Sequence, residues 1–297
     1  MNTALASSPR AAGLPPLVIA CLAATWLIWG STYLAIKIAL VSLPPFLQMG
    51  SRFLVAGGLL LAWMLWRGTP LPNAVQWRNA AIVGALMLGG GMGGTALAEV
   101  SVGSGLVVAF IAVVPLMIAL ISRLYGVKPA RGELAGIAVG LAGVLLLTRG
   151  AGFQASPAGL VAIAIACVTW SLGSVLSQRS LTLAPGAMGF ASEMICGGLV
   201  LMVLAAATGE SLPSHIEPQA IAAWVYLVVA GSLIAFNAYM VLLANASAGL
   251  ASSYTFVNPV IAMLLGVAVA GERITPLEWA AAGVILLGVV LLLRAKR

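Results

Sequence analysis

Residues 126–149 read GVKPARGELAGIAVGLAGVLLLTR, and residues 271–294 read GERITPLEWAAAGVILLGVVLLLR. The second stretch matches the first at a constant offset of 145 residues (271 − 126). The matching pairs are Gly126/Gly271, Glu133/Glu278, Ala135/Ala280, Val139/Val284, Leu141/Leu286, Gly143/Gly288, Val144/Val289 and Arg149/Arg294. Apolar matches alone would be common in so hydrophobic a chain, but glycine, glutamate and arginine matches in one register are not. The chain therefore consists of two related halves.

The residues that precede the two stretches repeat as well. The corresponding pairs are Pro115/Pro259, Thr25-Trp26/Thr169-Trp170, Gly30-Ser31/Gly173-Ser174 and Gly57-Gly58/Gly197-Gly198. We therefore predict a first repeat over residues 1–148 and a second over 149–297, joined near 149–156.

Apolar run length predicts the fold class. A helix needs about 20 apolar residues to cross a bilayer. Ten such runs lie near residues 15–40, 45–66, 79–98, 102–124, 132–148, 157–178, 187–207, 219–243, 249–270 and 276–294. The sequence thus predicts an all-α integral membrane protein with ten transmembrane helices in two five-helix repeats. Because five is odd, the second repeat is inverted, which is typical of secondary transporters that work by alternating access. A duplicated membrane scaffold without transport is the alternative.

Composition excludes a soluble fold and most enzymes. Hydrophobic residues make up 62% of the chain and charged residues 7%, against about 25% charged in soluble domains. With no aspartate and one histidine, neither a Ser-His-Asp triad nor an aspartyl dyad can be built. We predict no catalytic residue, metal or cofactor. The net charge of +7 lies at the ends of apolar runs, which indicates orientation in a bilayer rather than nucleic-acid binding.

Basic residues predict the orientation, because cytoplasmic loops are rich in lysine and arginine. If the N-terminus is cytoplasmic, ten basic residues fall on the inside and three in outside loops. The inside residues are Arg10, Arg67, Arg78, Arg123, Lys128, Arg131, Arg179, Arg294, Lys296 and Arg297. The outside residues are Lys37, Arg149 and Arg273. We predict a multi-pass protein of a bacterial inner membrane with both termini in the cytoplasm.

Short motifs carry a family resemblance. Trp29-Gly30-Ser31 followed by Lys37 resembles the first helix of the drug/metabolite transporter superfamily. Ser247-Ala248-Gly249, Asn258-Pro259-Val260, Gly271-Glu272-Arg273 and the run from Gly283 to Leu291 resemble the end of an EamA-type domain. The resemblance covers nearly the whole chain and is closest to bacterial aromatic-amino-acid exporters, which implies export of amino acids. One departure is Val102-Gly103, where the second half has Ala248-Gly249, so the fourth span is expected to differ in shape from the ninth.

Aromatic and polar residues within the spans are the candidates for a substrate-binding wall. The predicted set is Trp26, Trp29, Tyr33, Gly90, Trp170, Ser174, Gln178, Asn237, Tyr254 and Asn258. An amide in hydrocarbon needs a partner, so the asparagines should face the bundle interior, although hydrogen bonding between helices explains them equally well. We expect cargo to bind at mid-depth between the halves, bounded by spans one, three, four, six, eight and nine.

Glycine and proline suggest where helices bend. The third span carries Gly84, Gly89, Gly90, Gly91, Gly93 and Gly94, which either open space for a ligand or permit tight packing. Gly136 and Gly140 on the fifth span have the spacing of a packing surface. Pro115 and Pro259 should kink spans four and nine, either as a gate or to shape a cavity.

Charges within the spans limit the cargo. Arg52 is placed near the outer face and Glu193 near the inner face, about 10 Å apart in depth, which argues against a direct pair. Arg52 could instead meet Glu99 or Glu278. No basic cluster lies at mid-depth to bind a nucleotide sugar. Apolar walls with a few amides suit a small neutral or zwitterionic molecule.

Several functional alternatives stay open from the sequence. The preference for an amino acid rests on the family resemblance, and export of other drugs or metabolites is the alternative. A channel-like facilitator is another, although no charged ring marks a pore. Proton coupling through Glu193 is open as well. The expected partners are the lipid bilayer and a small-molecule substrate, with a monomer as the expected form.

Overall fold

The computed structural model describes residues 14–102, 107, 110–147, 156–270 and 275–295, and the regular structure in these ranges is helical. In chain order the elements are α1 (Pro16–Ala39), α2 (Pro45–Trp66), α3 (Ala74–Gly84), η1 (Ala85–Gly93), α4 (Gly94–Glu99), α6 (Val114–Leu124), α7 (Arg131–Leu147), α8 (Pro157–Arg179), α9 (Ala187–Ala207), α10 (Pro218–Tyr226), η2 (Leu227–Phe236), α11 (Asn237–Asn245), α12 (Ala248–Ala251), α13 (Tyr254–Ala270) and α14 (Pro276–Arg294). The two η elements are π-helical and continue directly into their α-helical neighbours.

Proline and glycine set many of the helix boundaries. A proline occupies the first turn of α1, α2, α8, α10 and α14, where its missing N–H leaves no hydrogen bond unmade. Gly68, Gly126, Gly186 and Gly209 adopt positive φ in the turns between helices, a conformation that side chains disfavour. These residues hold the connections short, so consecutive helices run antiparallel.

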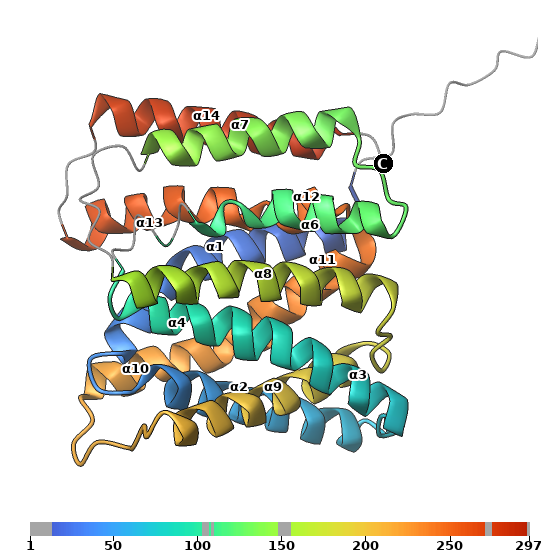
Figure 1. Cartoon of the computed structure of the whole chain (residues 1–297), viewed down its shortest axis with the longest axis vertical. Helices are drawn as coiled ribbons and strands as arrows, with labels where there is room; N and C mark the ends of the chain where they lie inside the picture. The colour runs from blue at the N-terminus through green and yellow to red at the C-terminus, as the bar shows by residue number, and fades with distance from the viewer. Residues whose placement is uncertain (1–13, 103–106, 108–109, 148–155, 271–274, 296–297) are drawn as a thin grey trace, which may run out of the picture.

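The helices run across the view in Figure 1 and form one bundle, whose two ends lie at the right and the left of the picture. α1 begins and α14 ends at the same end of this bundle, which we call the terminal end; the loop between α6 and α7 lies there too. The opposite end, here the far end, carries the α1–α2 and α9–α10 loops. Large apolar side chains are exposed along the bundle, as expected of a surface that faces lipid: examples are Leu27, Leu59, Leu145, Val161, Val203 and Leu287.

Eight of the predicted spans correspond to helical runs long and apolar enough to cross a membrane. The boundaries agree closely for most of them: the run predicted at 15–40 is Pro16–Ala39, and that at 187–207 is Ala187–Ala207. The other two predicted spans contain α6, with 11 residues, and α7, with 17, within the described ranges. The described ranges are therefore all-helical, as predicted, with eight runs suited to cross a membrane, while the count of ten crossings and the inversion of the second repeat stay predictions.

The packing of the two halves follows one pattern. α1 packs against α13 and η2, while α8 packs against α6 and η1. α2 pairs with α9, and α7 pairs with α14; Figure 1 places these two pairs at opposite sides of the bundle. Both pairs are close because glycines face the partner helix. An added Cβ on Gly198 would lie 2.9 Å from Leu54, and one on Gly288 only 2.6 Å from the Gly140 nitrogen.

The glycine-rich third span is π-helical in its middle, over η1, and α-helical on both sides. An added Cβ on Gly90 would lie 2.5 Å from the Thr169 hydroxyl oxygen, and one on Gly94 would lie 2.9 Å from the Ala162 carbonyl oxygen. Gly84, Gly89 and Gly93 are close to α9 in the same way, so tight packing against α8 and α9 accounts for the glycines of this span. η2 occupies the corresponding place in the second half, without a comparable run of glycine.

The two prolines expected to kink spans four and nine have different surroundings. Pro259 lies inside α13, where it removes one intrahelical hydrogen bond. Pro115 lies in the first turn of α6, immediately after a turn at Ala112–Val113. In span nine the break between α12 and α13 falls at Ser252–Ser253. The interruptions therefore lie at different distances from the two prolines.

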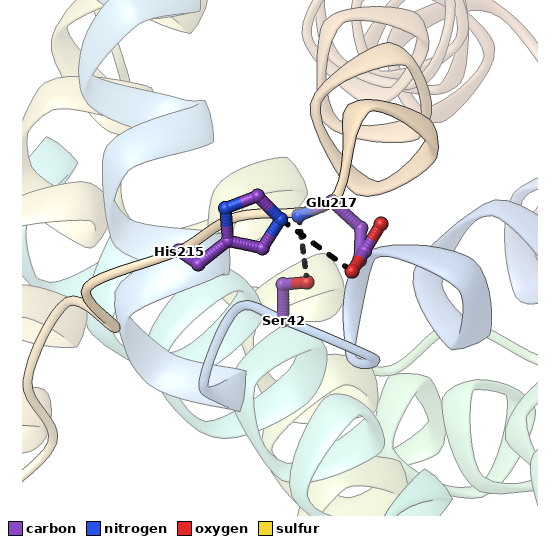
Figure 2. A network of polar contacts seen from close by, with 3 residues as sticks. All are labelled: Ser42, His215 and Glu217. Atoms are coloured by element: carbon purple, nitrogen blue, oxygen red, sulfur yellow. Dashed lines mark hydrogen bonds and ion pairs between the residues drawn. The ribbon is translucent and has the colours of Figure 1, made fainter.

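Polar contacts between the halves tie the far end together. The Glu210 carboxylate accepts hydrogen bonds from the backbone N–H groups of Phe46 (3.2 Å) and Leu47 (2.7 Å), in the first turn of α2. Figure 2 shows that the Ser42 hydroxyl accepts from the Glu217 backbone N–H (3.1 Å) and that His215 lies 3.6 Å from the Glu217 carboxylate. The His215–Glu217 pair is exposed and contributes little, whereas a carboxylate on free helix N–H groups is a strong cap.

Candidate functional site

Four aromatic side chains from four helices meet in the middle of the bundle. This aromatic cluster consists of Trp29 (α1), Trp170 (α8), Tyr239 (α11) and Tyr254 (α13), and all four are buried. Ring centroids in contact are 4.6 to 5.7 Å apart, mostly tilted or edge-on, within the range that favours aromatic pairs. Residues from both halves of the chain thus build one compact wall across the bundle.

Hydrogen bonds fix the rings of the aromatic cluster. The Trp170 indole N–H donates to the Tyr239 hydroxyl (3.2 Å), and the Ser174 hydroxyl donates to the Trp170 carbonyl (2.7 Å). The Tyr239 hydroxyl therefore donates to Ser174 Oγ, 2.9 Å away. The Trp29 indole N–H donates to the Gly231 carbonyl in η2 (3.2 Å).

A small cavity of about 50 Å³ lies on one side of the aromatic cluster. Its lining is Trp29, Thr32, Tyr33, Ile36, Gly91, Met92, Thr95, Ile111, Val114, Ala166, Cys167, Trp170, Tyr254 and Asn258. The Asn258 amide faces the Tyr33 hydroxyl, but neither of its polar atoms makes a hydrogen bond of good geometry. A buried amide without partners is costly, so this group is free to bind a ligand. The cavity has room for little more than water.

A much larger cavity, of about 690 Å³, opens at the terminal end. We call it the vestibule; its lining includes Ser122, Glu133, Ser177, Gln178, Arg179, Phe190, Met240, Leu243, Asn245 and Ser247. The Gln178 amide donates to the Leu243 carbonyl, which joins α8 to α11 along this wall. Glu133 accepts from the Gly249 N–H (2.6 Å) at the start of α12. The vestibule is large enough for an amino acid, and it ends near the aromatic cluster.

Arg52 is fully buried without an ion-pair partner within the described ranges. Its Nε donates to Ser232 Oγ (2.7 Å), and its guanidinium carbon lies 4.8 Å from the centre of the Phe53 ring. The predicted meeting with Glu99 or Glu278 is not observed, since Glu278 caps its own helix through Thr275. Arg52 therefore fastens α2 to η2 rather than to a carboxylate.

The comparison with known families decides the class of protein. Residues 16–149 and 157–294 each match the model of the EamA-like transporter family. The chain belongs to this family. It is 44% identical over 274 residues to the "Uncharacterized inner membrane transporter YedA" of Escherichia coli (strain K12), covering 92% of this chain and 89% of that protein.

More distant EamA relatives and a solved structure agree with this membership. "Protein PecM" of Dickeya dadantii is 30% identical over 244 residues, covering 80% of each chain. A crystal structure of another protein matches with a TM-score of 0.78 at 24% identity, covering 94% of this chain and 99% of that one, which shows a shared fold. The predicted resemblance is thereby confirmed, and an EamA-family chain is a transporter of small molecules rather than an enzyme.

Many residues of the predicted binding wall lie around the aromatic cluster of this EamA-family protein. Five of them, Trp29, Tyr33, Trp170, Tyr254 and Asn258, line the small cavity. Two more predicted residues, Ser174 and Gln178, lie on α8 after Trp170. Ser174 bonds to the Tyr239 hydroxyl, and Gln178 lines the vestibule.

The other predicted residues lie outside both cavities. The Trp26 indole donates to Ser253 Oγ (2.9 Å), between the two hydrophobic cores. The Asn237 amide donates to the carbonyls of Ser232 and Leu233 at the end of η2. Gly90 packs on α8, and its neighbour Gly91 is the glycine that lines the small cavity.

Tyr239 is the central residue that the predicted set lacks. It contacts all three other rings of the aromatic cluster. The sequence offers one signal for it, a tyrosine inside an apolar run two residues after Asn237. That signal marks the depth of the residue but not the direction in which it points.

Proposed function

We propose that this chain is a secondary transporter that exports small neutral or zwitterionic molecules by alternating access, with the cargo site at the aromatic cluster. The supporting observation is a closed wall between two unequal cavities. A vestibule of about 690 Å³ opens at the terminal end, and a cavity of about 50 Å³ lies against the aromatic cluster. A carrier needs a site that opens to one side at a time, whereas an open channel needs a continuous pore.

The repeat supports the alternating part of the proposal. The family model matches residues 16–149 and residues 157–294 separately, which supports the predicted division into two repeats. In addition, α1 packs against α13 as α8 packs against α6, so corresponding helices have corresponding neighbours. Two inverted halves of similar structure can exchange conformations, which converts a vestibule at one end into a vestibule at the other.

The lining chemistry supports the cargo class. The small cavity is lined by aromatic, apolar and small polar residues, and no charged side chain is among them. Such a surface favours a compact cargo with an apolar body and a few groups for Asn258, Tyr33 and the backbone. Aromatic amino acids fit this description, and the family resemblance favours them. Other neutral drugs or metabolites are the second candidate.

The placement of basic residues supports the orientation of the chain in the membrane, and a relative supports its location in an inner membrane. The terminal end carries the helix ends with Arg67, Arg123, Arg131, Arg179 and Arg294. Basic residues gather on the cytoplasmic side of membrane proteins, so we place both termini in the cytoplasm and the vestibule facing inward. The relative YedA is described as an inner membrane transporter, which supports an inner-membrane location for this chain.

The test is counterflow of a panel of radiolabelled amino acids in vesicles that contain the purified protein, with phenylalanine as the main probe. Trp170→Ala and Asn258→Ala should lower the exchange rate at least about tenfold, since each removes a central contact to cargo. The matched control is Trp279→Ala, which deletes an indole that is 57% exposed on α14.

Two outcomes would decide against the proposal, and a third would correct its cargo. Normal exchange by both cavity variants, at equal protein per vesicle, would remove the site. Flux that does not saturate and shows no counterflow would favour the channel-like facilitator. Exchange of other neutral metabolites but of no amino acid would leave the carrier mechanism intact and correct the cargo.

A further inference from the structure

Glu193 is a fully buried carboxylate for which the fold provides no partner. It lies on α9 with no accessible surface, and neither of its oxygens has a hydrogen-bond partner. Within the described ranges no ion pair involves it. An ionised carboxylate in such surroundings is strongly disfavoured unless a cation or a proton neutralises it. A scaffold helix gains nothing from such a group, so a role in transport is the better explanation.

The position of Glu193 connects it to the transport path. Phe190, three residues earlier on the same face of α9, lines the vestibule. Met240 lines it as well, and its neighbour Tyr239 lies within range of the Glu193 charge. Glu193 therefore lies one helical turn from a vestibule residue and within range of the aromatic cluster, although it lines neither cavity itself.

The neighbouring elements offer no compensating charge. α9 itself contributes Cys196, α11 contributes Tyr239, and α3 presents the backbone of Gly84. On α2, the nearest cation is Arg52. Gly50 lies opposite Met202 and Gly57 opposite Met194, so Arg52 is level with a residue near 200 on α9. That is about 10 Å along the helix axis from Glu193, beyond the reach of an ion pair.

Glu99 provides a contrast within the same chain. Both of its carboxylate oxygens are also buried without hydrogen-bond partners. However, the positive charge of Lys37 acts on it, and it lies at the end of α4 next to Tyr33, on the other side of the aromatic cluster. Glu99 thus lies nearer to a cation than Glu193 does, which makes it the natural comparison.

We propose that Glu193 is the proton-binding residue through which this transporter couples cargo export to proton entry. The inference rests on the proposed function and adds its energy source. With the path open outward, a proton from outside binds the Glu193 carboxylate. With the path open to the vestibule, the proton leaves to the cytoplasm and cargo binds. One proton then moves inward for each cargo molecule that moves outward.

The experiment compares two measurements in vesicles that contain the purified full-length chain, with radiolabelled phenylalanine as probe and the membrane potential held at zero. Counterflow without a pH gradient reports binding and movement of cargo. Accumulation driven by a gradient of one pH unit reports coupling, and one proton per cargo gives about tenfold accumulation. Glu193→Gln should keep counterflow within about threefold of wild type and lose the accumulation entirely. Glu99→Gln should keep both.

Other outcomes would overturn the assignment. Glu193→Gln that still accumulates phenylalanine about tenfold would refute it. Equal loss of accumulation in both variants would refute the assignment to Glu193 alone, as would a wild type that shows counterflow but no accumulation.

A measurement without cargo keeps the test independent of the proposed function. The wild-type infrared spectrum at pH 7 should contain the carbonyl band of a protonated carboxylic acid that Glu193→Gln lacks. Counterflow absent for every amino acid would refute the proposed cargo, while this band would still report on Glu193. An ionised Glu193 at pH 7 would refute the inference.

Discussion

The contact between α7 and α14 offers a sharp test of the packing. An added Cβ on Gly288 would lie 2.6 Å from the Gly140 nitrogen, 2.8 Å from its Cα and 3.0 Å from the Gly136 carbonyl oxygen. Ordinary contacts are about 3.5–4.0 Å, so Gly288→Ala must part the two backbones by about 1 Å. Overpacking of this kind costs about 1–3 kcal/mol, and the better helix propensity of alanine offsets up to about 1 kcal/mol. We expect a net loss of about 1–2 kcal/mol.

The control for Gly288→Ala lies on the same helix. Gly283 is exposed, and an added Cβ there would meet nothing within 4 Å. Gly283→Ala should therefore leave the protein as stable as wild type or slightly more stable. Thermal unfolding in detergent, followed by size-exclusion fluorescence, should place the Tm of Gly288→Ala about 2–8 °C below that of Gly283→Ala. Equal Tm values would refute the close approach of α7 and α14.

Two further substitutions test the polar groups inside the bundle. Tyr239→Phe keeps the ring but deprives the Trp170 indole N–H of its acceptor, so it should cost about 1–3 kcal/mol in unfolding free energy. Tyr125→Phe, at an exposed site, is its control, and equal Tm values would contradict the hydrogen bond. Arg52→Met should stay within about 1 kcal/mol of wild type, because a buried charge without a carboxylate partner is often replaced at no loss. A large fall in Tm would mean that the hydrogen bond to Ser232 stabilises the fold by more than burial of the Arg52 charge costs.

The positions of most spans could be predicted because one simple physical requirement fixes them. A helix must keep apolar side chains in lipid over the full thickness of the bilayer, and its ends fall where proline, glycine or charge appears. Pro157 starts α8 at the predicted residue, and Arg179 ends it one residue beyond the predicted end. Arg131 and Glu133, in the first turn of α7, shorten the apolar run there, which is one reason why that span is less distinct.

The direction in which interior side chains point could not be predicted in the same way. A mean hydropathy profile has no preferred face in a helix that is apolar on all sides, so Trp26 and Trp29 were equally good candidates. The structure turns Trp29 into the aromatic cluster and Trp26 toward Ser253. The π-helices could not be predicted from the sequence for a related reason. η2 depends on packing against α1 and α2 rather than on a distinctive local sequence.

The arrangement of like helices suggests which parts must move. α2 pairs with α9 and α7 with α14 through close glycine contacts, and these pairs lie at opposite sides of the bundle. Between them lie the helices that supply the aromatic cluster and line the small cavity, while Glu133 of α7 and Phe190 of α9 also line the vestibule. A path to the far end can open only if contacts between the halves there are broken, and one of these is the hydrogen bond from the Glu217 N–H, before α10, to the Ser42 hydroxyl, after α1. The Glu210 cap on the first turn of α2 instead joins the two helices of an outer pair, α2 and α9. Closely packed outer pairs and a breakable polar contact at one end fit a mechanism in which the inner helices tilt against stable flanks.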